Sequence, residues 1–112
     1  MPCVDTTQLL KGVLDLAVLA VLRDEDGYGY DILRRLRAAG LQEVGDASVY
    51  GTLRRLYANG FLNTYVVPSD EGPHRKYYAL NAAGRAELER NGKTWRAFAS
   101  IMDDLTRERG TA

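Results

Sequence analysis

A helix-forming segment that ends before Gly60 carries side chains whose types suit contact with nucleic acid. On a helical projection, Val49, Leu53 and Leu56 fall together, which predicts a side that packs on a core. The opposite side is small and basic, and no acidic residue lies between Ala47 and Gly60. A helix that enters the major groove needs small residues where its backbone approaches, hydrogen-bonding groups for base edges and cations for phosphates. The candidate DNA-contacting residues on this helix are Ser48, Tyr50, Gly51, Thr52, Arg54 and Arg55.

A second basic group follows a predicted turn. Arg75 and Lys76 come shortly after Gly72 and Pro73, at the start of a strand-forming stretch. Basic hairpin tips suit the minor groove or the flanking phosphates, and we predict DNA contact for both cations. Two plainer interpretations stay open. In the first, this side of the helix is simply exposed to solvent, with Tyr50 packed at its edge. In the second, the charges of the wing only prevent pairing with strands of other chains.

No other group of residues in the chain predicts a reaction or a metal site. His74 is the only histidine and Cys3 the only cysteine, so no spacing typical of a zinc site exists, and we expect His74 on the surface. The carboxylates are scattered singly, and no nucleophile has a base partner. The run Gly27-Tyr28-Gly29 is not a dinucleotide fingerprint, because no strand is predicted before it. We therefore predict neither enzyme activity nor a cofactor.

The elements that must position these residues follow the order helix, helix, helix, hairpin, helix. The patterns predict helices over residues 6–23 and 28–39, the helix that ends before Gly60, a β-hairpin over residues 61–80 and a last helix over residues 81–107. This order is typical of a winged helix-turn-helix, a mainly α fold with a small β-hairpin. We assign residues 1–80 to the DNA-binding domain and residues 81–112 to a C-terminal dimerisation helix.

Several residues mark the ends and faces of these helices. The expected N-cap residues are Asp5, Thr6 or Thr7 for the first helix, Asp46 for the third and Asn81 for the last. Gly40 stands where the second helix needs a residue in the left-handed conformation. Within the second helix, the spacing predicts that Tyr30, Leu33 and Leu36 face the core.

The last helix carries an apolar seam that predicts a partner. Its members, at alternating spacings of three and four, are Leu88, Asn91, Trp95, Phe98, Met102 and Leu105, with Ile101 beside them. Gly92 near the middle costs about 1 kcal/mol of helix propensity, so we expect a partner to stabilise this helix and favour a second subunit. The first helix is apolar nearly all round, which predicts burial on more than one side. The candidate dimerisation residues are Leu10, Leu14, Leu88, Phe98, Ile101, Met102 and Leu105.

Composition narrows the class of protein. A chain of 112 residues with 46% apolar and 27% charged residues fits one ordinary globular domain. Its formal net charge is zero, so any DNA binding must come from a local basic surface. The longest apolar stretch is broken by Lys11 and Asp15 and is too short to span a bilayer, and no signal-peptide pattern opens the chain. We expect a soluble, cytoplasmic protein without a membrane partner.

The sequence resembles the PadR-like transcriptional regulators over nearly the whole chain. The matching blocks read GYGYDI (27–32), SVYGTLRRL (48–56), NGFL (59–62) and RKYYALN (75–81), with Gly84 just after them. The single C-terminal helix is similar to that of the short subgroup, whose members are phenolic-acid-type and multidrug-type sensors. The resemblance implies a homodimer on an inverted-repeat operator in double-stranded DNA. It also implies repression that is relieved when a small molecule binds.

The resemblance further implies a ligand role for Trp95. In drug-sensing members of the family, a tryptophan at the corresponding place stacks on flat aromatic ligands at the dimer centre. Trp95 would do so here, with Leu9, Asp15 and Leu16 of the first helix lining the pore. Two alternatives stay open. One is that Trp95 has no ligand and only fills the core of the dimer. The other is that the whole chain is a winged-helix protein–protein interaction module without an operator.

Overall fold

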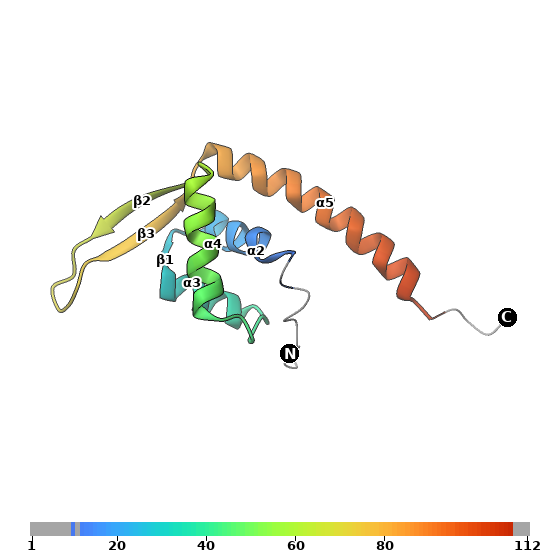
Figure 1. Ribbon diagram of the computed structural model, residues 1–112, viewed down its shortest axis with the longest axis horizontal. Coiled ribbons are helices and arrows are strands. Elements are labelled where there is room, and N and C mark those ends of the chain that lie inside the picture. The colour runs from blue at the N-terminus through green and yellow to red at the C-terminus, as the bar shows by residue number, and fades with distance from the viewer. Residues whose placement is uncertain (1–9, 11, 109–112) are drawn as a thin grey trace.

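The computed structural model describes residue 10 and residues 12–108, and it is mainly helical with one small sheet (Figure 1). Its elements are α2 (Leu14–Asp24), β1 (Gly27–Tyr28), α3 (Gly29–Ala38), α4 (Asp46–Ala58), β2 (Leu62–Val67), β3 (Arg75–Leu80) and α5 (Ala82–Thr106). Helices α2, α3 and α4 form one group, the β2–β3 hairpin projects from one side of it, and α5 extends away on the other (Figure 1). The fold is therefore the predicted winged helix-turn-helix with an added C-terminal helix.

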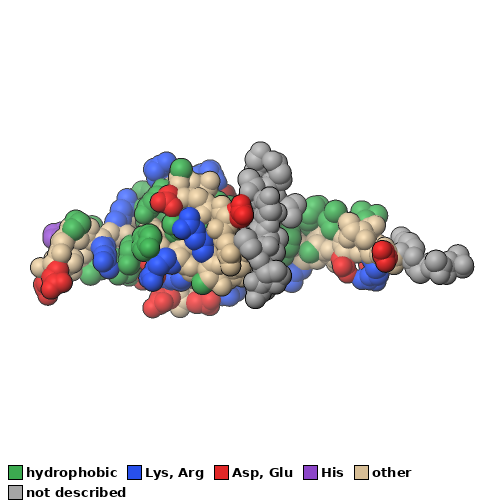
Figure 2. Space-filling view, turned by 90° about the horizontal axis from the view of Figure 1, so that it is seen from below, with side chains coloured by type: hydrophobic (Ala, Val, Ile, Leu, Met, Phe, Trp, Pro, Cys, Tyr) green, Lys and Arg blue, Asp and Glu red, His purple; other side chains and the backbone are tan. Residues whose placement is uncertain are grey.

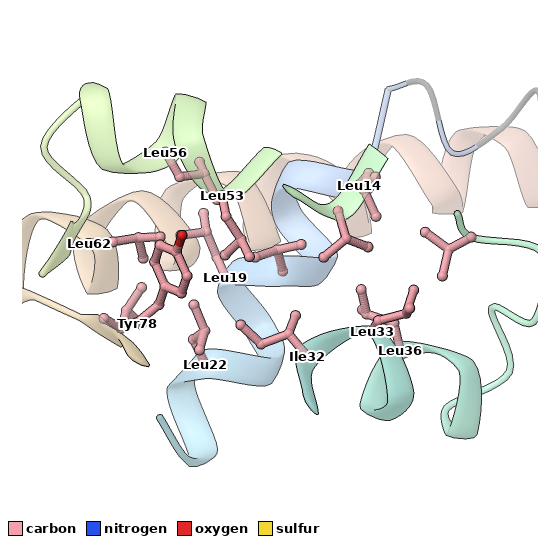
Figure 3. Close-up of a cluster of buried hydrophobic side chains, with 14 of the residues drawn as sticks. Leu14, Leu19, Leu22, Ile32, Leu33, Leu36, Leu53, Leu56, Leu62 and Tyr78 are labelled. Carbon is pink, nitrogen blue, oxygen red and sulfur yellow. The ribbon is translucent and has the colours of Figure 1, made fainter. Parts of the chain in front are cut away.

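The core lies where α2, α3 and α4 meet, and the hairpin closes one end of it with Leu62 and Tyr78 (Figure 3). Val49, Leu53 and Leu56 of α4 are at most 2% exposed, as the helical projection predicted. Burial of such a side chain is worth about 1.5–3 kcal/mol relative to exposure. This packing fixes the rotation of α4 about its own axis and leaves its opposite side to the solvent.

The first predicted helix is interrupted by a turn. Leu10 is helical, Gly12 and Val13 form the turn, and the helix α2 starts at Leu14. Among the residues other than proline, glycine has the lowest helix propensity, which accounts for a break at this point. The proposed N-cap residues 5–7 lie outside the described residues.

A short strand, β1, precedes α3 and was not predicted. Gly27 and Tyr28 were expected to form a turn and a helix start, but they pair antiparallel with Tyr78 and Tyr77 of β3. The sheet therefore has three strands, in the order β1-β3-β2. Two residues are too few to show the alternating pattern by which a strand is recognised. The pairing joins the wing directly to the start of α3.

The loop before β1 is held by one arginine from α3. Arg35 donates from Nη1 to the carbonyl oxygens of Val21 at 3.1 Å and Glu25 at 2.8 Å. Its Nη2 donates to the carbonyl oxygen of Asp26 and to Oδ2 of Asp31, both at 2.6 Å. One of these carbonyls, that of Val21, is in the last turn of α2, where the helix leaves carbonyls unpaired, and the other two are in the loop that follows. Arg35 therefore fixes the end of α2, the loop and the start of α3 relative to one another.

Strands β2 and β3 form the predicted hairpin, with Leu62 opposite Leu80 and Val67 opposite Arg75. Successive side chains alternate between the two faces of the sheet. Leu62 and Leu80 lie on the face that packs on the core, whereas Tyr65 and its partner Tyr77 lie on the outer face. The hairpin thus has a buried face toward α4 and an aromatic face away from it.

The helix ends agree with the sequence at two of the three positions that the described residues test. Gly40 has a φ of 122°, as expected for a residue that follows a helix in the left-handed region. Asn81 caps α5, because its side chain accepts a hydrogen bond from the backbone N–H of Gly84 at 2.8 Å. The third prediction was wrong. Asp46 is the first residue of α4, and Gly45 is the N-cap residue, without a side-chain cap bond.

Helix α5 starts against the domain and then leaves it (Figure 1). Gly84 is buried, and a Cβ atom there would lie 2.2 Å from the carbonyl oxygen of Phe61, so only glycine allows this close approach. One turn later, Leu88 is half-buried and packs against the core. The apolar residues from Trp95 onward are exposed.

Candidate nucleic-acid interface

The outward side of α4 carries four of the six predicted residues. Ser48, Tyr50 and Arg54 are exposed, and Gly51 is half-buried. Thr52 is different, because it is only 3% exposed and lies among the core residues. On the helical projection it falls next to Leu56, at the edge of the apolar side, so its buried hydroxyl is not presented to DNA. The prediction that Thr52 offers a hydrogen-bonding group to a base edge was therefore wrong.

Arg55 points to helix α2 and binds Asp15. The Nε of Arg55 lies 3.4 Å from Oδ2 of Asp15, and its Nη2 makes a closer contact with Oδ1. The hydrogen bond and the negative charge of Asp15 together raise the pKa of Arg55 above its ordinary value. Arg55 was predicted to contact phosphate and Asp15 to line a ligand pore, and in the structure the two form an ion pair whose side chains stay about half exposed. Arg54, one residue earlier, is the arginine at the centre of the exposed side.

Tyr50 lies over the first turn of α3. A Cβ atom at Gly29 would be 2.1 Å from Cε1 of Tyr50, so the glycine leaves the space that this ring occupies. The ring still exposes more than a third of its surface. The two interpretations of Tyr50 thus combine, since packing on Gly29 fixes the ring while its remaining surface faces solvent.

Replacing Gly29 with alanine is expected to weaken DNA binding about fivefold, the effect of about one lost hydrogen bond. The added methyl group would displace the ring of Tyr50 from α3. The loss of binding would therefore come from moving Tyr50, since the substitution itself removes no DNA-contacting residue. Titration of a DNA duplex followed by fluorescence anisotropy measures the change. Gly72→Ala is the control, because nothing lies within 4 Å of a Cβ atom there. An equal loss from Gly29→Ala in a Tyr50→Ala background would contradict this explanation.

The two wing cations lie on opposite faces of β3. Lys76 shares the face that packs toward α4, and its Nζ is 5.6 Å from the ring centroid of Tyr57 and 5.5 Å from that of Tyr78. Arg75 is on the outer face, where its Cζ lies 4.6 Å from the ring centroid of Tyr28. Lys76 therefore extends the basic side of α4, and Arg75 is held by an aromatic ring.

The connection between β2 and β3 carries negative charge at the end of the wing. Asp70, Glu71 and His74 are exposed there, and His74 was expected on the surface. Seen from below, acidic side chains and the histidine stand at this end, basic and acidic side chains are interspersed over the middle, and hydrophobic side chains gather over α5 at the other end (Figure 2). Cations are thus presented by α4 and by the end of β3 next to this connection, whereas the connection itself carries acidic side chains.

An aromatic cluster on the outer face of the sheet was missed in the sequence. Tyr77 stacks on Tyr65 with ring centroids 5.5 Å apart and an interplanar angle of 16°. Its other neighbour, Tyr28, meets it edge-on at 5.5 Å and 63°. The hydroxyl of Tyr65 donates a hydrogen bond to Oδ2 of Asp26 at 2.6 Å. That bond raises the pKa of Tyr65, because the donated proton becomes harder to remove. Only the pairing of β1 and β2 with β3 brings these residues together.

Tyr30 was predicted to lie in the core, but it is 54% exposed. It stands two positions before Ile32, a step that places it on the side of α3 opposite the buried residues. Its ring lies 5.6 Å from the guanidinium carbon of Arg34, which binds Asp31 at 2.9 Å. Tyr30 and Tyr57 are therefore exposed aromatic residues near the candidate interface that sequence reasoning did not propose.

The predicted dimerisation residues divide into two groups. Leu10 and Leu14 are each 8% exposed and belong to the core of their own chain, and Leu88 is half-buried against that core. Within one chain, Leu10 and Leu14 therefore leave little surface for a partner. The remaining residues of the set are exposed on the free part of α5, namely Phe98, Ile101, Met102 and Leu105.

The predicted ligand residues are likewise dispersed. Asp15 and Leu14 line a hollow of about 380 Å³ between α2 and α4, and Trp95 is not among the described residues that line it. Leu16 is half-buried on α2. Leu9 lies outside the described residues. Trp95 is exposed on α5, with its ring centroid 6.3 Å from that of Phe98.

The described residues contain no group of three or more His, Cys, Asp or Glu side chains that could hold a metal ion. No helix in the described part of the chain is both long and apolar enough to cross a membrane.

Comparison with known proteins places this geometry among transcriptional regulators. The family model described as the transcriptional regulator PadR-like family matches residues 18–90. A PadR-like transcriptional regulator from Bacillus cereus is 29% identical, with a TM-score of 0.80 over 91% of this chain and 99% of that one. A transcriptional regulator from Streptococcus is 30% identical, with a TM-score of 0.78 over 89% of this chain and 98% of that one.

A third structure contains DNA. It is Bacillus subtilis PadR in complex with operator DNA, at 24% identity and a TM-score of 0.62. The match covers 89% of this chain and 50% of that chain. At this identity the likeness concerns the fold.

Proposed function

This chain belongs to the PadR-like family of transcriptional regulators, whose members are regulators and not enzymes, and we propose that it represses transcription as a homodimer bound to operator DNA. In this proposal residues 1–80 bind an inverted-repeat operator and residues 81–112 hold the dimer together. Two copies of α4 enter successive major grooves about one helical turn apart.

The observation that carries the proposal is the charge state of the exposed side of α4 and of the first two residues of β3. Among the described residues, no carboxylate lies within salt-bridge distance of Arg54, Arg75 or Lys76. By contrast, Arg55 forms an ion pair with Asp15. Cations without an acidic partner, next to the small residues Ser48 and Gly51, suit phosphates on both sides of a groove.

The exposed apolar residues of α5 support the dimer. Phe98 and Ile101 each expose more than half of their surface, although they are large apolar side chains on a rigid helix. Apolar patches of this kind on soluble proteins mark interaction sites. The most direct occupant is the same stretch of a second copy, because a two-fold axis places identical patches face to face.

The ligand part of the proposal rests on Trp95. Its exposed ring lies beside Phe98, so two copies in a dimer would present facing aromatic surfaces to a planar molecule. Such a molecule releases the operator only if it binds more tightly to a dimer whose α4 helices are wrongly spaced for DNA. Tryptophan fluorescence across a panel of planar aromatic compounds tests this part independently of DNA.

A double substitution tests the DNA-binding proposal. Arg54→Ala with Arg75→Ala is expected to weaken binding at least about tenfold and to make the salt dependence shallower by roughly two counterions. Binding is measured by mobility shift on the DNA upstream of the protein's own gene, at two or more salt concentrations. The control is Arg85→Ala with Arg96→Ala, two exposed arginines of α5 away from α4.

The outcomes separate the repressor from a protein–protein interaction module. Tight, salt-dependent binding that only the first variant loses supports the repressor. If wild type and both variants bind DNA equally weakly, and selection from random duplexes recovers no operator, the interaction module is favoured instead.

A further inference from the structure

The outer face of the wing contains a connected set of contacts that ends at a cation. Tyr65 stacks on Tyr77, Tyr77 and Tyr28 form a T-shaped pair, and Arg75 lies over the ring of Tyr28. Tyr65 and Tyr77 face each other across the β2–β3 pair, and Tyr28 faces Tyr77 across β1 and β3. One residue from each of the three strands therefore supports the position of Arg75.

The other end of this set is attached to the helical part of the domain. Tyr65 donates its hydroxyl proton to the carboxylate of Asp26, which lies in the loop between α2 and β1. The backbone of the same loop accepts hydrogen bonds from Arg35, at Glu25 and at Asp26 itself. The loop is thus fixed to α3, and through Tyr65 it holds β2, the outer strand of the wing.

Arg75 remains able to bind an anion in this arrangement. A guanidinium that stacks on an aromatic ring keeps its N–H donors at the rim of its plane. The described residues give Arg75 no carboxylate partner within salt-bridge distance. Stacking removes rotamer freedom from the side chain before it meets a phosphate, so less order must be imposed on binding.

We propose that Tyr65 and Asp26 are positioning residues for DNA binding, which hold the wing at the angle where the ring-stacked Arg75 meets a phosphate beside the operator groove. This inference rests on the proposed function and extends it to two residues that do not themselves touch DNA. Asp26 is an acidic residue, which would be unfavourable close to a phosphate-binding surface. In this proposal its role is to accept the hydrogen bond from Tyr65.

The position of the wing can be changed without a large change in the free energy of unfolding. Tyr65 is 43% exposed, and hydrogen bonds between exposed groups add little to the free energy of unfolding. Loss of the Tyr65 hydroxyl leaves the ring stack in place. It removes only the restraint on the angle between the wing and the helical part of the domain. Its effect should therefore appear in DNA binding and not in the unfolding transition.

The test compares Tyr65→Phe and Asp26→Ala with Asp26→Asn, which keeps an oxygen that can accept the bond. DNA affinity is measured on a duplex selected from random sequences with the wild-type protein, and thermal unfolding is followed on the same samples. Tyr65→Phe and Asp26→Ala are expected to weaken binding about fivefold with unchanged unfolding, the size of one lost hydrogen bond. Asp26→Asn is expected to bind like the wild type.

A double-mutant cycle with Arg75→Ala decides the route of the effect. If Tyr65 acts through Arg75, then Tyr65→Phe causes no further loss once Arg75 is alanine. A fivefold loss that persists in the Arg75→Ala background, or wild-type binding by Tyr65→Phe, overturns the inference while the proposed function stands. Absence of any duplex selected by the wild-type protein overturns both.

Discussion

Phe98→Glu combined with Ile101→Glu is expected to convert the protein to a monomer and to lower its affinity for operator DNA by about 100-fold or more. The two residues expose 55% and 57% of their surface on the free part of α5, where the proposed dimer would cover them. A carboxylate buried in an apolar interface without a partner is strongly unfavourable. A monomer also loses the second half-site, and linking two binding modules contributes about 10²–10⁴ to the overall affinity.

The measurements are sedimentation equilibrium for the mass of the particle and mobility shift for DNA binding. Ala86→Glu with Ser100→Glu is the matched control, because it adds the same charge to the same helix at exposed positions with no large apolar residue one turn away. The control is expected to remain a dimer that binds DNA. A wild-type protein that is itself monomeric, or a Phe98/Ile101 variant that binds operator normally, would contradict the dimer.

Arg35→Met is expected to lower the free energy of unfolding by about 3 kcal/mol, because it removes charged hydrogen bonds to three backbone carbonyls and to Asp31. The arginine side chain is only 22% exposed, so water cannot fully replace these bonds. Methionine keeps much of the length and apolar volume of the arginine stem. Urea denaturation followed by circular dichroism measures the change.

Arg34→Met is the control for Arg35→Met. Arg34 also binds Asp31, but its side chain is 58% exposed and makes no backbone bond among the described residues. The expected loss is below about 0.5 kcal/mol, as for other exposed ion pairs. Equal effects of the two substitutions would show that only the ion pair with Asp31 matters, and not the bonds to the loop.

Local patterns in the sequence were enough to predict most of the fold. The core side of α4 was found because Val49, Leu53 and Leu56 repeat at the helical period within one element. The N-cap at Asn81 and the left-handed Gly40 were found for the same reason, since each depends on its nearest neighbours in the chain. Features of this kind are encoded within a few residues of one another.

Contacts between distant segments could not be predicted in this way. Arg55 and Asp15 are 40 residues apart, and Tyr65 and Asp26 are 39 residues apart. Nothing in the local pattern shows that an exposed arginine has an acidic neighbour from another helix. The misplacement of Thr52 has a related cause, because it lies at the boundary between the two sides of α4 and the packing of neighbouring elements decides its burial.

The free part of α5 also bears on how such a regulator would respond to its own abundance. In the dimer proposed above, the apolar residues beyond Trp95 are covered only when two chains meet, so coverage follows mass action. Below the dissociation constant of the dimer, halving the number of chains reduces the number of dimers about fourfold. Operator occupancy would then change more steeply with gene dosage than for a monomeric repressor.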